Sequence, residues 1–241
     1  MEWLATDMNA LSRHVFAARE IAPWGTQILE RLCNLHEMGV TQRLLAIGAA
    51  ISDIVRRSDH MVFAYLSNHT SDIVRQWAVY SVNALPRITL RERLDLTRPF
   101  AADNNMSVRE CAWMAFRPYL AQNVSATIER LAPWTRDADP NIRRFAIEVS
   151  RPRSVWGEHI PSLKTNPMIG LSLLNAVKSD DSFYVRTAVG NWLHDAWKSS
   201  PEWVESVCEQ WHRNATKYTL WIVRRALRTK YRGKRSGRRK A

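Results

Sequence analysis

The stretch DPNIRRFAIEV, residues 139–149, decides how the chain folds. It opens with Asp139 and Pro140, a combination that begins helices, because the aspartate caps free backbone amides and proline suits the first turn. The apolar residues that follow recur three and four positions apart; they are Ile142, Phe145, Ala146 and Val149. Such spacing places them on one side of a helix, so the stretch predicts an amphipathic helix with one buried face.

The same pattern recurs along the chain around an arginine. A turn or polar residue, an apolar residue and the arginine precede a helical apolar stripe; the arginines are Arg75, Arg109, Arg143, Arg186 and Arg224. Their steps are 34, 34, 43 and 38 residues, and a weaker copy at Arg43 lies 32 residues before Arg75. Steps of this size fit one helix pair per repeat. We expect each arginine to lie just inside the second helix of its pair and to meet acidic residues of the neighbouring repeat.

This repeat determines the predicted fold class. No stretch of strictly alternating polar and apolar residues supports a β-strand, so we expect an all-α protein. Helix pairs at this period predict a right-handed α-solenoid of HEAT-like helical pairs, whose concave face is the natural binding surface. We expect a single repeat domain over residues 1–230 and a basic, flexible tail over residues 231–241.

The basic charge of the chain is concentrated at one end. The formal net charge is +12, yet residues 1–209 are neutral, and no acidic residue follows Glu209. Twelve lysines and arginines lie between Arg213 and Lys240. By composition, the segment from Arg228 to Lys240 is a phosphate-binding arm. The alternative is a solvated terminus without a partner.

The remaining composition excludes several classes of protein. The cysteines Cys33, Cys111 and Cys208 are odd in number and far apart, which indicates buried thiols in a reducing cytosol. No paired cysteines or histidines have zinc-site spacing, and we expect no metal and no cofactor. No apolar run reaches the roughly 18 residues of a membrane span. Residues 1–7 show no signal peptide, so we expect the protein in the cytoplasm and without membrane contact. We also expect it to be a monomer.

Two carboxylates and an amide are predicted to share one edge of the repeat array. Glu148 lies five residues after Arg143, and Asn191 lies five residues after Arg186. Equivalent offsets in neighbouring repeats project to the same face, and Asp195 follows Asn191 by one helical turn. We therefore expect Glu148, Asn191 and Asp195 on one flank. Two tryptophans, Trp113 and Trp156, are expected near them.

Structural roles are the alternatives for several of these residues. Glu148 is spaced to pair with Arg144 or Arg151, and Asp195 to pair with Lys198 or cap a loop. Most of the eleven tryptophans must pack in the core; Trp77, Trp192 and Trp221 lie on helical stripes.

Two segments resemble a family of DNA repair proteins. The first is RRFAIEVSRPRSVWG, residues 143–157, and the second is YVRTAVGNWLHDAWKSSPEWV, residues 184–204. With TLWIVRRALRT near the C-terminus, they resemble the AlkC/AlkD family of DNA alkylation-repair glycosylases, and more closely its AlkC branch. The residues that match the pattern are Glu148, Arg151, Pro152, Arg153, Trp156, Tyr184, Val185, Arg186, Asn191 and Asp195. The chain departs from it at Trp192 and His194, where the family pattern has asparagines.

The resemblance implies a function and a set of site residues. It implies a HEAT-like solenoid that wraps duplex DNA carrying alkylated bases and removes a cationic base without swinging it into a deep pocket. Some AlkC proteins carry an extra β-sandwich domain; we expect this chain to lack it, because a basic tail stands in its place. Glu148 and Asp195 are then the catalytic candidates. The candidates for DNA contact are Trp113, Arg117, Arg151, Arg153, Trp156, Asn191 and Trp192.

These roles fit the chemistry of the reaction. An alkylated purine that is already cationic leaves without a general acid, so a carboxylate needs only to stabilise the cationic sugar and position a water. Indole faces attract cations, and arginines hold phosphates. Two other functions stay open: a DNA-binding solenoid of the same family without activity, and a HEAT-like protein-interaction scaffold.

Overall fold

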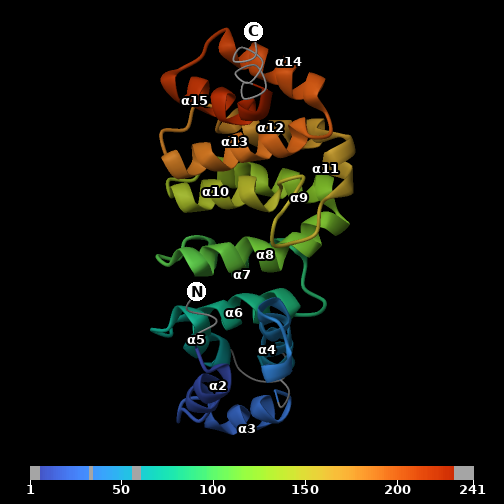
Figure 1. Cartoon of the computed structure of the whole chain (residues 1–241). Coiled ribbons are helices and arrows are strands. Elements are labelled where there is room, and N and C mark those ends of the chain that lie inside the picture. The colour runs from blue at the N-terminus through green and yellow to red at the C-terminus, as the bar shows by residue number, and fades with distance from the viewer. Residues whose placement is uncertain (1–5, 33–34, 56–60, 231–241) are drawn as a thin grey trace, which may run out of the picture. The chain divides into compact units, whose positions relative to one another are not determined.

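The computed structural model describes residues 6–32, 35–55 and 61–230, and its regular elements there are all helical (Figure 1). The α-helices are α2 (Met8–Phe16), α3 (Ala22–Glu30), α4 (Val40–Val55), α5 (Met61–Ser67), α6 (Asp72–Ala84), α7 (Leu90–Ala101), α8 (Met106–Gln122), α9 (Val124–Leu131), α10 (Pro140–Val149), α11 (Pro161–Thr165), α12 (Leu171–Ala176), α13 (Phe183–Trp197), α14 (Pro201–His212) and α15 (Lys217–Ala226). Short 3-10 helices are η1 (Leu35–Glu37), η2 (Ala132–Arg136) and η3 (Pro167–Gly170). The described residues contain no strand, which confirms the all-α class of helix pairs.

The chain forms two compact units, residues 1–115 and residues 116–241. In the first unit, α4 packs along α6, and α6 also contacts α5 and α7. Helix α4 approaches α6 closely at Gly48, where a Cβ atom would lie 2.6 Å from the Cβ of Tyr80. The single repeat domain over residues 1–230 depends on how the units are arranged and stays a prediction.

The second unit stacks its helices in layers around a tryptophan. Helix α10 packs against α13, and α13 packs against α15 and α14 (Figure 1). Trp192 of α13 is fully buried, and its Nε1 donates a hydrogen bond of 2.8 Å to the Ser150 carbonyl at the end of α10. Gly170 faces the same indole, because a Cβ there would lie 2.4 Å from it. These contacts fix α10 relative to α13.

The repeat arginines bind the turn before their own helix. In Arg75, Arg109, Arg143 and Arg186, Nη1 donates to the backbone carbonyls six and five residues earlier, at distances of 2.5–3.2 Å. Two of them also form bidentate ion pairs with an aspartate of the next repeat, Arg75 with Asp103 and Arg143 with Asp180. The predicted pairing between repeats is confirmed for these two. Arg224 is exposed instead, and no helix pair follows it within the described residues to supply an acid.

Two of the three cysteines lie in the described part of the chain. Cys111 and Cys208 are buried free thiols, and burial raises the pKa of each to about 12. Cys33 and the tail from Tyr231 onward lie outside the described residues. Within the described ranges no group of three histidine, cysteine or acidic residues could hold a metal ion. No described helix has both the length and the hydrophobicity needed to cross a bilayer.

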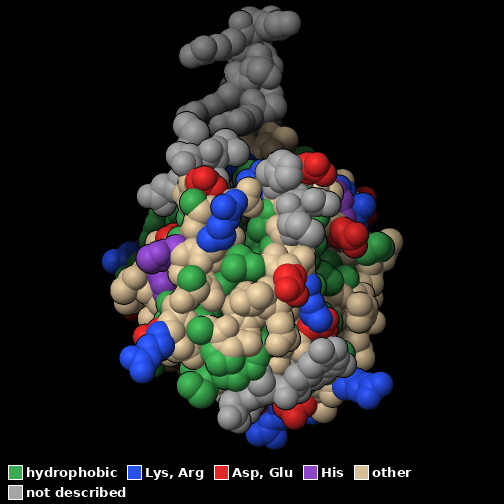
Figure 2. Space-filling view, turned by 90° about the horizontal axis from the view of Figure 1, so that it is seen from below, with side chains coloured by type: hydrophobic (Ala, Val, Ile, Leu, Met, Phe, Trp, Pro, Cys, Tyr) green, Lys and Arg blue, Asp and Glu red, His purple; other side chains and the backbone are tan. Residues whose placement is uncertain are grey.

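One face of the molecule shows its charges interspersed. In the view of Figure 2, acidic and basic side chains are scattered singly among hydrophobic and other side chains, without a row of one sign. This pattern agrees with the formal neutrality of residues 1–209. A binding surface for an anion in this part of the chain therefore requires local sorting of charge.

Candidate functional site

The two predicted carboxylates lie together on neighbouring helices. Glu148 is in the last turn of α10 and is 5% exposed, and Asp195 is in the last turn of α13 and is 4% exposed. Arg151, which follows α10, joins them. Its Nη1 lies 2.5 Å from Oε1 of Glu148, and its Nε and Nη2 lie 2.9 Å and 2.7 Å from Oδ2 of Asp195. The flank predicted from the repeat offsets is therefore a compact cluster of buried charges.

Further cations surround this carboxylate cluster. Nη2 of Arg144 lies 3.7 Å from Oε2 of Glu148, and its guanidinium stacks on the ring of Tyr184 at 4.1 Å. Nζ of Lys198 lies 3.4 Å from Oδ1 of Asp195. All the ion pairs considered as alternatives for these carboxylates are thus present. Because both carboxylates are buried, these are not the weak surface pairs that sequence spacing suggests.

Arg151 keeps its charge in this setting. Burial by itself lowers the pKa of Arg151, but the neighbouring Glu148 and Asp195 outweigh that effect and raise it above the ordinary value. A buried ion pair requires that the desolvation of its groups be offset by close opposite charges and hydrogen bonds. Here one guanidinium meets both carboxylates, so it holds their orientation as well as compensating their charge.

Arg117, predicted to contact DNA, has a structural role instead. It is 3% exposed, and its guanidinium donates to the carbonyls of Val149, Arg151 and Glu158 at 2.7–2.8 Å. Burial, followed by the cation of Arg151, lowers the pKa of Arg117 to about 10. The prediction was wrong because a guanidinium engaged with three carbonyls inside the protein has no face left for a phosphate. It holds the segment after α10 in place.

That segment presents two exposed apolar side chains. Val155 and Trp156 are 83% and 70% exposed. The Oγ of Ser154 accepts hydrogen bonds from the backbone amides of Trp156 and Gly157, at 3.2 Å and 3.0 Å. Arg153, in the same segment, donates from Nε to the Asp195 carbonyl at 3.3 Å, and its Nη2 lies 2.6 Å from the Ser199 Oγ. The predicted indole of Trp156 is therefore on the surface, on a loop tied to the carboxylate cluster.

Two of the tryptophans predicted to contact DNA are buried. Trp192 is 0% exposed and belongs to the core, as its position on the apolar stripe of α13 indicated, so its inclusion among the DNA contacts was wrong. Trp113 belongs to the first compact unit and is buried, and its Nε1 donates to Oε2 of Glu110 at 2.8 Å. That Trp113 stands near the carboxylates stays a prediction.

Asn191 leads to a residue that sequence reasoning missed. The Oδ1 of Asn191 accepts a hydrogen bond of 3.1 Å from Nε of Arg225, in α15. The sequence contains one signal for Arg225, a second arginine directly after the repeat arginine Arg224. Only the packing of α15 on α13 reveals which of the two turns toward Asn191.

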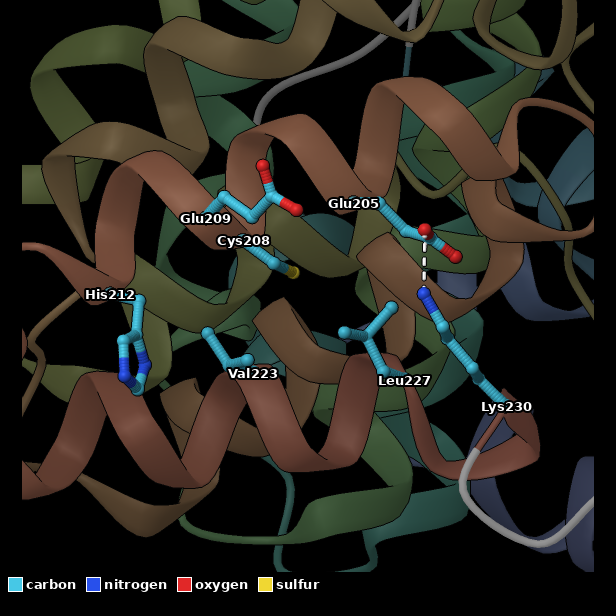
Figure 3. Close-up of a pocket in the computed structure, with 7 residues that line it drawn as sticks. All are labelled: Glu205, Cys208, Glu209, His212, Val223, Leu227 and Lys230. Atoms are coloured by element: carbon cyan, nitrogen blue, oxygen red, sulfur yellow. Dashed lines mark ion pairs between the residues drawn. The ribbon is translucent and has the colours of Figure 1, made fainter. Parts of the chain in front are cut away.

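A separate pocket lies between the last two helices. It has a volume of about 250 Å³ and is lined by Glu205, Cys208, Glu209, His212, Val223, Leu227 and Lys230 (Figure 3). Nζ of Lys230 lies 2.6 Å from Oε2 of Glu205, and both residues line the pocket (Figure 3). No member of the carboxylate cluster lines this pocket, so it is not part of the site built on Glu148 and Asp195.

The fold and this site define a class of protein. The chain belongs to the family described as DNA alkylation repair enzyme, whose sequence pattern matches residues 97–229, more than half of the chain. This confirms the predicted relation to the AlkC/AlkD type of protein. In sequence, the chain is 38% identical over 115 residues to the uncharacterized protein YhaZ of Bacillus subtilis (strain 168), a match that covers 48% of this chain and 32% of YhaZ.

Several solved structures resemble the chain. The alkylpurine DNA glycosylase AlkC of Pseudomonas fluorescens, bound to DNA containing an abasic-site analogue, has a TM-score of 0.77 and 26% identity over 91% of this chain and 62% of AlkC. AlkD2 from Streptococcus mutans has a TM-score of 0.63 and 22% identity over 85% of this chain and 97% of AlkD2. The protein smu.31 of Streptococcus mutans UA159 has a TM-score of 0.60 and 21% identity over 89% and 97%. The last two show the fold alone. The chain spans about a third of YhaZ and less than two thirds of AlkC.

Proposed function

We propose that this chain is a DNA glycosylase that removes cationic alkylated bases from duplex DNA by hydrolysing the N-glycosidic bond. The substrates are bases such as 3-methyladenine, 7-methylguanine or 3-methylcytosine. The observation that carries the proposal is the buried pair Glu148 and Asp195, held together by Arg151, in a member of a DNA alkylation repair family. We also propose that the protein acts as a monomer in the cytoplasm.

The chemistry requires little besides such a carboxylate pair. When the bond to a cationic base breaks, its electrons go to the base, which leaves neutral, and positive charge develops on the sugar. A carboxylate near that sugar stabilises the charge in a site that excludes water. It also orients the attacking water, whose oxygen bonds to the sugar carbon while its proton passes to the carboxylate. No general acid and no metal ion take part in this scheme.

Arg151 gives the pair the preorganisation that electrostatic catalysis needs. A charge that is fixed before the reaction stabilises a developing charge without reorganising. Arg151 binds Glu148 with one nitrogen and Asp195 with two, so neither carboxylate turns away from the other. Arg151, predicted earlier as a phosphate contact, acts in this proposal through the two carboxylates it holds.

The surroundings of the pair favour a polyanionic partner. Around two carboxylates, the cluster contains the cations of Arg144, Arg151, Arg153, Lys198 and Arg225. A local excess of positive charge attracts the phosphates of duplex DNA. The exposed indole of Trp156, on the loop that follows α10, supplies an aromatic face for a base or sugar. AlkC, which the chain resembles, is described as bound to DNA, and this supports the partner.

The alternative of an inactive DNA-binding relative rests on two departures from the family pattern. Trp192 is a core residue, and His194 is 7% exposed with its Nδ1 3.0 Å from the Ala226 carbonyl. Both departures therefore serve the packing of α13 on its neighbours. They leave the carboxylates and Arg151 intact, so they do not favour an inactive protein.

Base release from methylated duplex DNA tests the proposal. Glu148→Gln and Asp195→Asn keep the shape of each side chain but remove its charge. We expect release of the free base to fall about a hundredfold or more, the scale of losing a preorganised electrostatic contact. Affinity for duplex DNA should be unchanged or slightly higher, because a negative charge near the phosphates is removed.

A matched control separates charge in general from charge at this site. Glu129 is an exposed carboxylate on α9, and Glu129→Gln removes the same charge elsewhere in the same unit. It should leave base release unchanged. Full activity of folded Glu148→Gln and Asp195→Asn, or no base release by the unaltered chain from any methylated duplex, would contradict the proposal.

A further inference from the structure

Arg225 is a half-buried cation without an acidic partner in the described part of the chain. It lies on α15, and no ion pair joins it to a carboxylate among those residues. Its charged neighbour is instead Arg151, a second cation; burial first, and Arg151 next, lower the pKa of Arg225. Like charges brought together in a partly buried site cost free energy. A group whose pKa is perturbed by burial and a neighbouring charge is a candidate for a functional site.

The guanidinium of Arg225 is held in place by three neighbours. Its Nε donates to Oδ1 of Asn191 at 3.1 Å, and its centre lies 5.5 Å from the ring of Trp221. Its aliphatic stem crosses α13 at Gly190, where a Cβ would come within 2.9–3.0 Å of three of its carbon atoms. Any side chain at position 190 would push the stem away. The glycine and the amide together direct this arginine along α13.

Two of the three guanidinium nitrogens have no hydrogen-bond partner among the described residues. Nε is used by Asn191, while Nη1 and Nη2 of Arg225 have none there. These are the groups that form the outer fork of an arginine, whose parallel N–H bonds match two oxygens of one phosphate. The donors of Nη1 and Nη2 are therefore available to a ligand, while Asn191, Trp221 and Gly190 hold the guanidinium in position.

We propose that Arg225 holds a backbone phosphate of the DNA beside the carboxylate cluster and so sets the register of the strand. The ligand is a phosphodiester, because the proposed function supplies one next to this site; the inference rests on that function. Arg151 is a charged neighbour of Arg225 and contacts both Glu148 and Asp195. A phosphate bound to Arg225 is therefore beside the carboxylate cluster. Phosphate contacts position a protein on its duplex without reading sequence. Arg225 is accordingly a positioning residue, with Asn191 as its support.

The neighbouring arginine provides a matched control. Arg224 lies on the same helix and is exposed. Arg225→Gln and Arg224→Gln remove the same charge from adjacent positions. The probe is a duplex that contains an abasic-site analogue, and affinity is measured by fluorescence anisotropy over a range of salt concentrations. Thermal unfolding of each variant checks that the fold is kept.

We expect Arg225→Gln to weaken binding about tenfold and to lower the slope of log affinity against log salt by about one. Arg224→Gln should change affinity less than about twofold, because an exposed arginine directed elsewhere makes no fixed phosphate contact. Asn191→Ala should weaken binding in the same direction but less, because it frees the arginine without removing its charge.

Replacing phosphates one at a time by neutral methylphosphonates locates the contact. With the unaltered chain, one position close to the abasic site should weaken binding; with Arg225→Gln, the same position should have no effect. If Arg225→Gln binds as tightly as the unaltered chain, or keeps the same sensitivity at every position, the inference is wrong. Base release is scored separately. A chain that binds through Arg225 but releases no base would contradict the glycosylase proposal alone.

Discussion

At the scale of single residues, the site depends on one arginine shared by two carboxylates. Glu148 and Asp195 come from different helices, and each would be costly to bury alone. Arg151 meets both within 2.9 Å, so the three side chains are stable only together. This explains why charges important for the proposed reaction also tie the end of α10 to α13.

Among the residues predicted to contact DNA, exposure and hydrogen-bond partners distinguish Arg117 from Trp156. Arg117 and Trp156 both lie near the carboxylates, but the first is 3% exposed and the second 70%. The buried arginine binds backbone carbonyls and supports the loop that presents the exposed tryptophan. The sequence analysis names both residues as candidates for DNA contact and cannot tell support from contact.

The exposed indole leads to a prediction for Trp156. Trp156→Ala should weaken binding to duplex DNA about tenfold, as expected when a stacking or sugar contact with an aromatic face is lost. The free energy of unfolding should hardly change, because the side chain packs on little of the protein. Val155→Ala, at the adjacent exposed position, serves as the control. Unchanged affinity of Trp156→Ala would exclude the indole from the DNA interface.

At the scale of elements, the repeat arginine fixes how one helix pair meets the next. Its Nη1 closes the turn before its own helix, and its other nitrogens reach the aspartate that begins the next turn. In the second unit Arg143 makes these contacts, and it lies in the same helix as Glu148. The carboxylate at the end of α10 is thus positioned from both ends of its helix, by Arg143 and by Arg151.

Replacing the repeat arginine Arg143 tests this role. Arg143→Ala breaks a bidentate pair with Asp180 and two hydrogen bonds to carbonyls, leaving a mostly buried carboxylate unpaired. We expect the free energy of unfolding to fall by about 3 kcal/mol. Urea denaturation measures it, and Arg130→Ala, at an exposed position on α9, should cost under about 0.5 kcal/mol. Equal effects of the two variants would mean that the contacts of Arg143 do not contribute to the free energy of unfolding.

At the scale of the whole molecule, charge is arranged in two places. The body up to Glu209 is formally neutral, so its cations act only where they gather, around Glu148 and Asp195. The remaining excess lies in the last helix and the segment after it. A local cationic cluster beside an aromatic side chain favours nucleic acid over the protein-scaffold alternative.

The basic terminal segment has a prediction of its own. Residues 232–241 contain six lysines and arginines and no acid. If several of them contact phosphates, deleting the segment should weaken binding to every duplex alike and flatten the salt dependence by about one unit for each lost contact. Salt titrations of the full and shortened chains measure this. A salt slope that stays the same after deletion would mean that the segment makes no phosphate contact.

The sequence by itself determined the helix pairs, their period and the flank of the carboxylates. Apolar spacing of three and four residues and an arginine at each repeat are local signals, and equivalent offsets project to equivalent faces. Thus the pattern around Arg143 and Arg186 sufficed to bring Glu148 and Asp195 to one edge. The motifs that indicated the family are likewise local stretches of sequence, so they could be recognised without the tertiary structure.

The tertiary structure alone decided what each polar side chain does there. Arg117 turned inward to three carbonyls, Arg151 became the bridge between two carboxylates, and Arg225 rather than Arg224 reached Asn191. An arginine stem is long and flexible, so its partner depends on which carbonyls, carboxylates and glycines the packed helices place within its reach. Those distances arise from residues more than thirty positions apart, and no local pattern contains them.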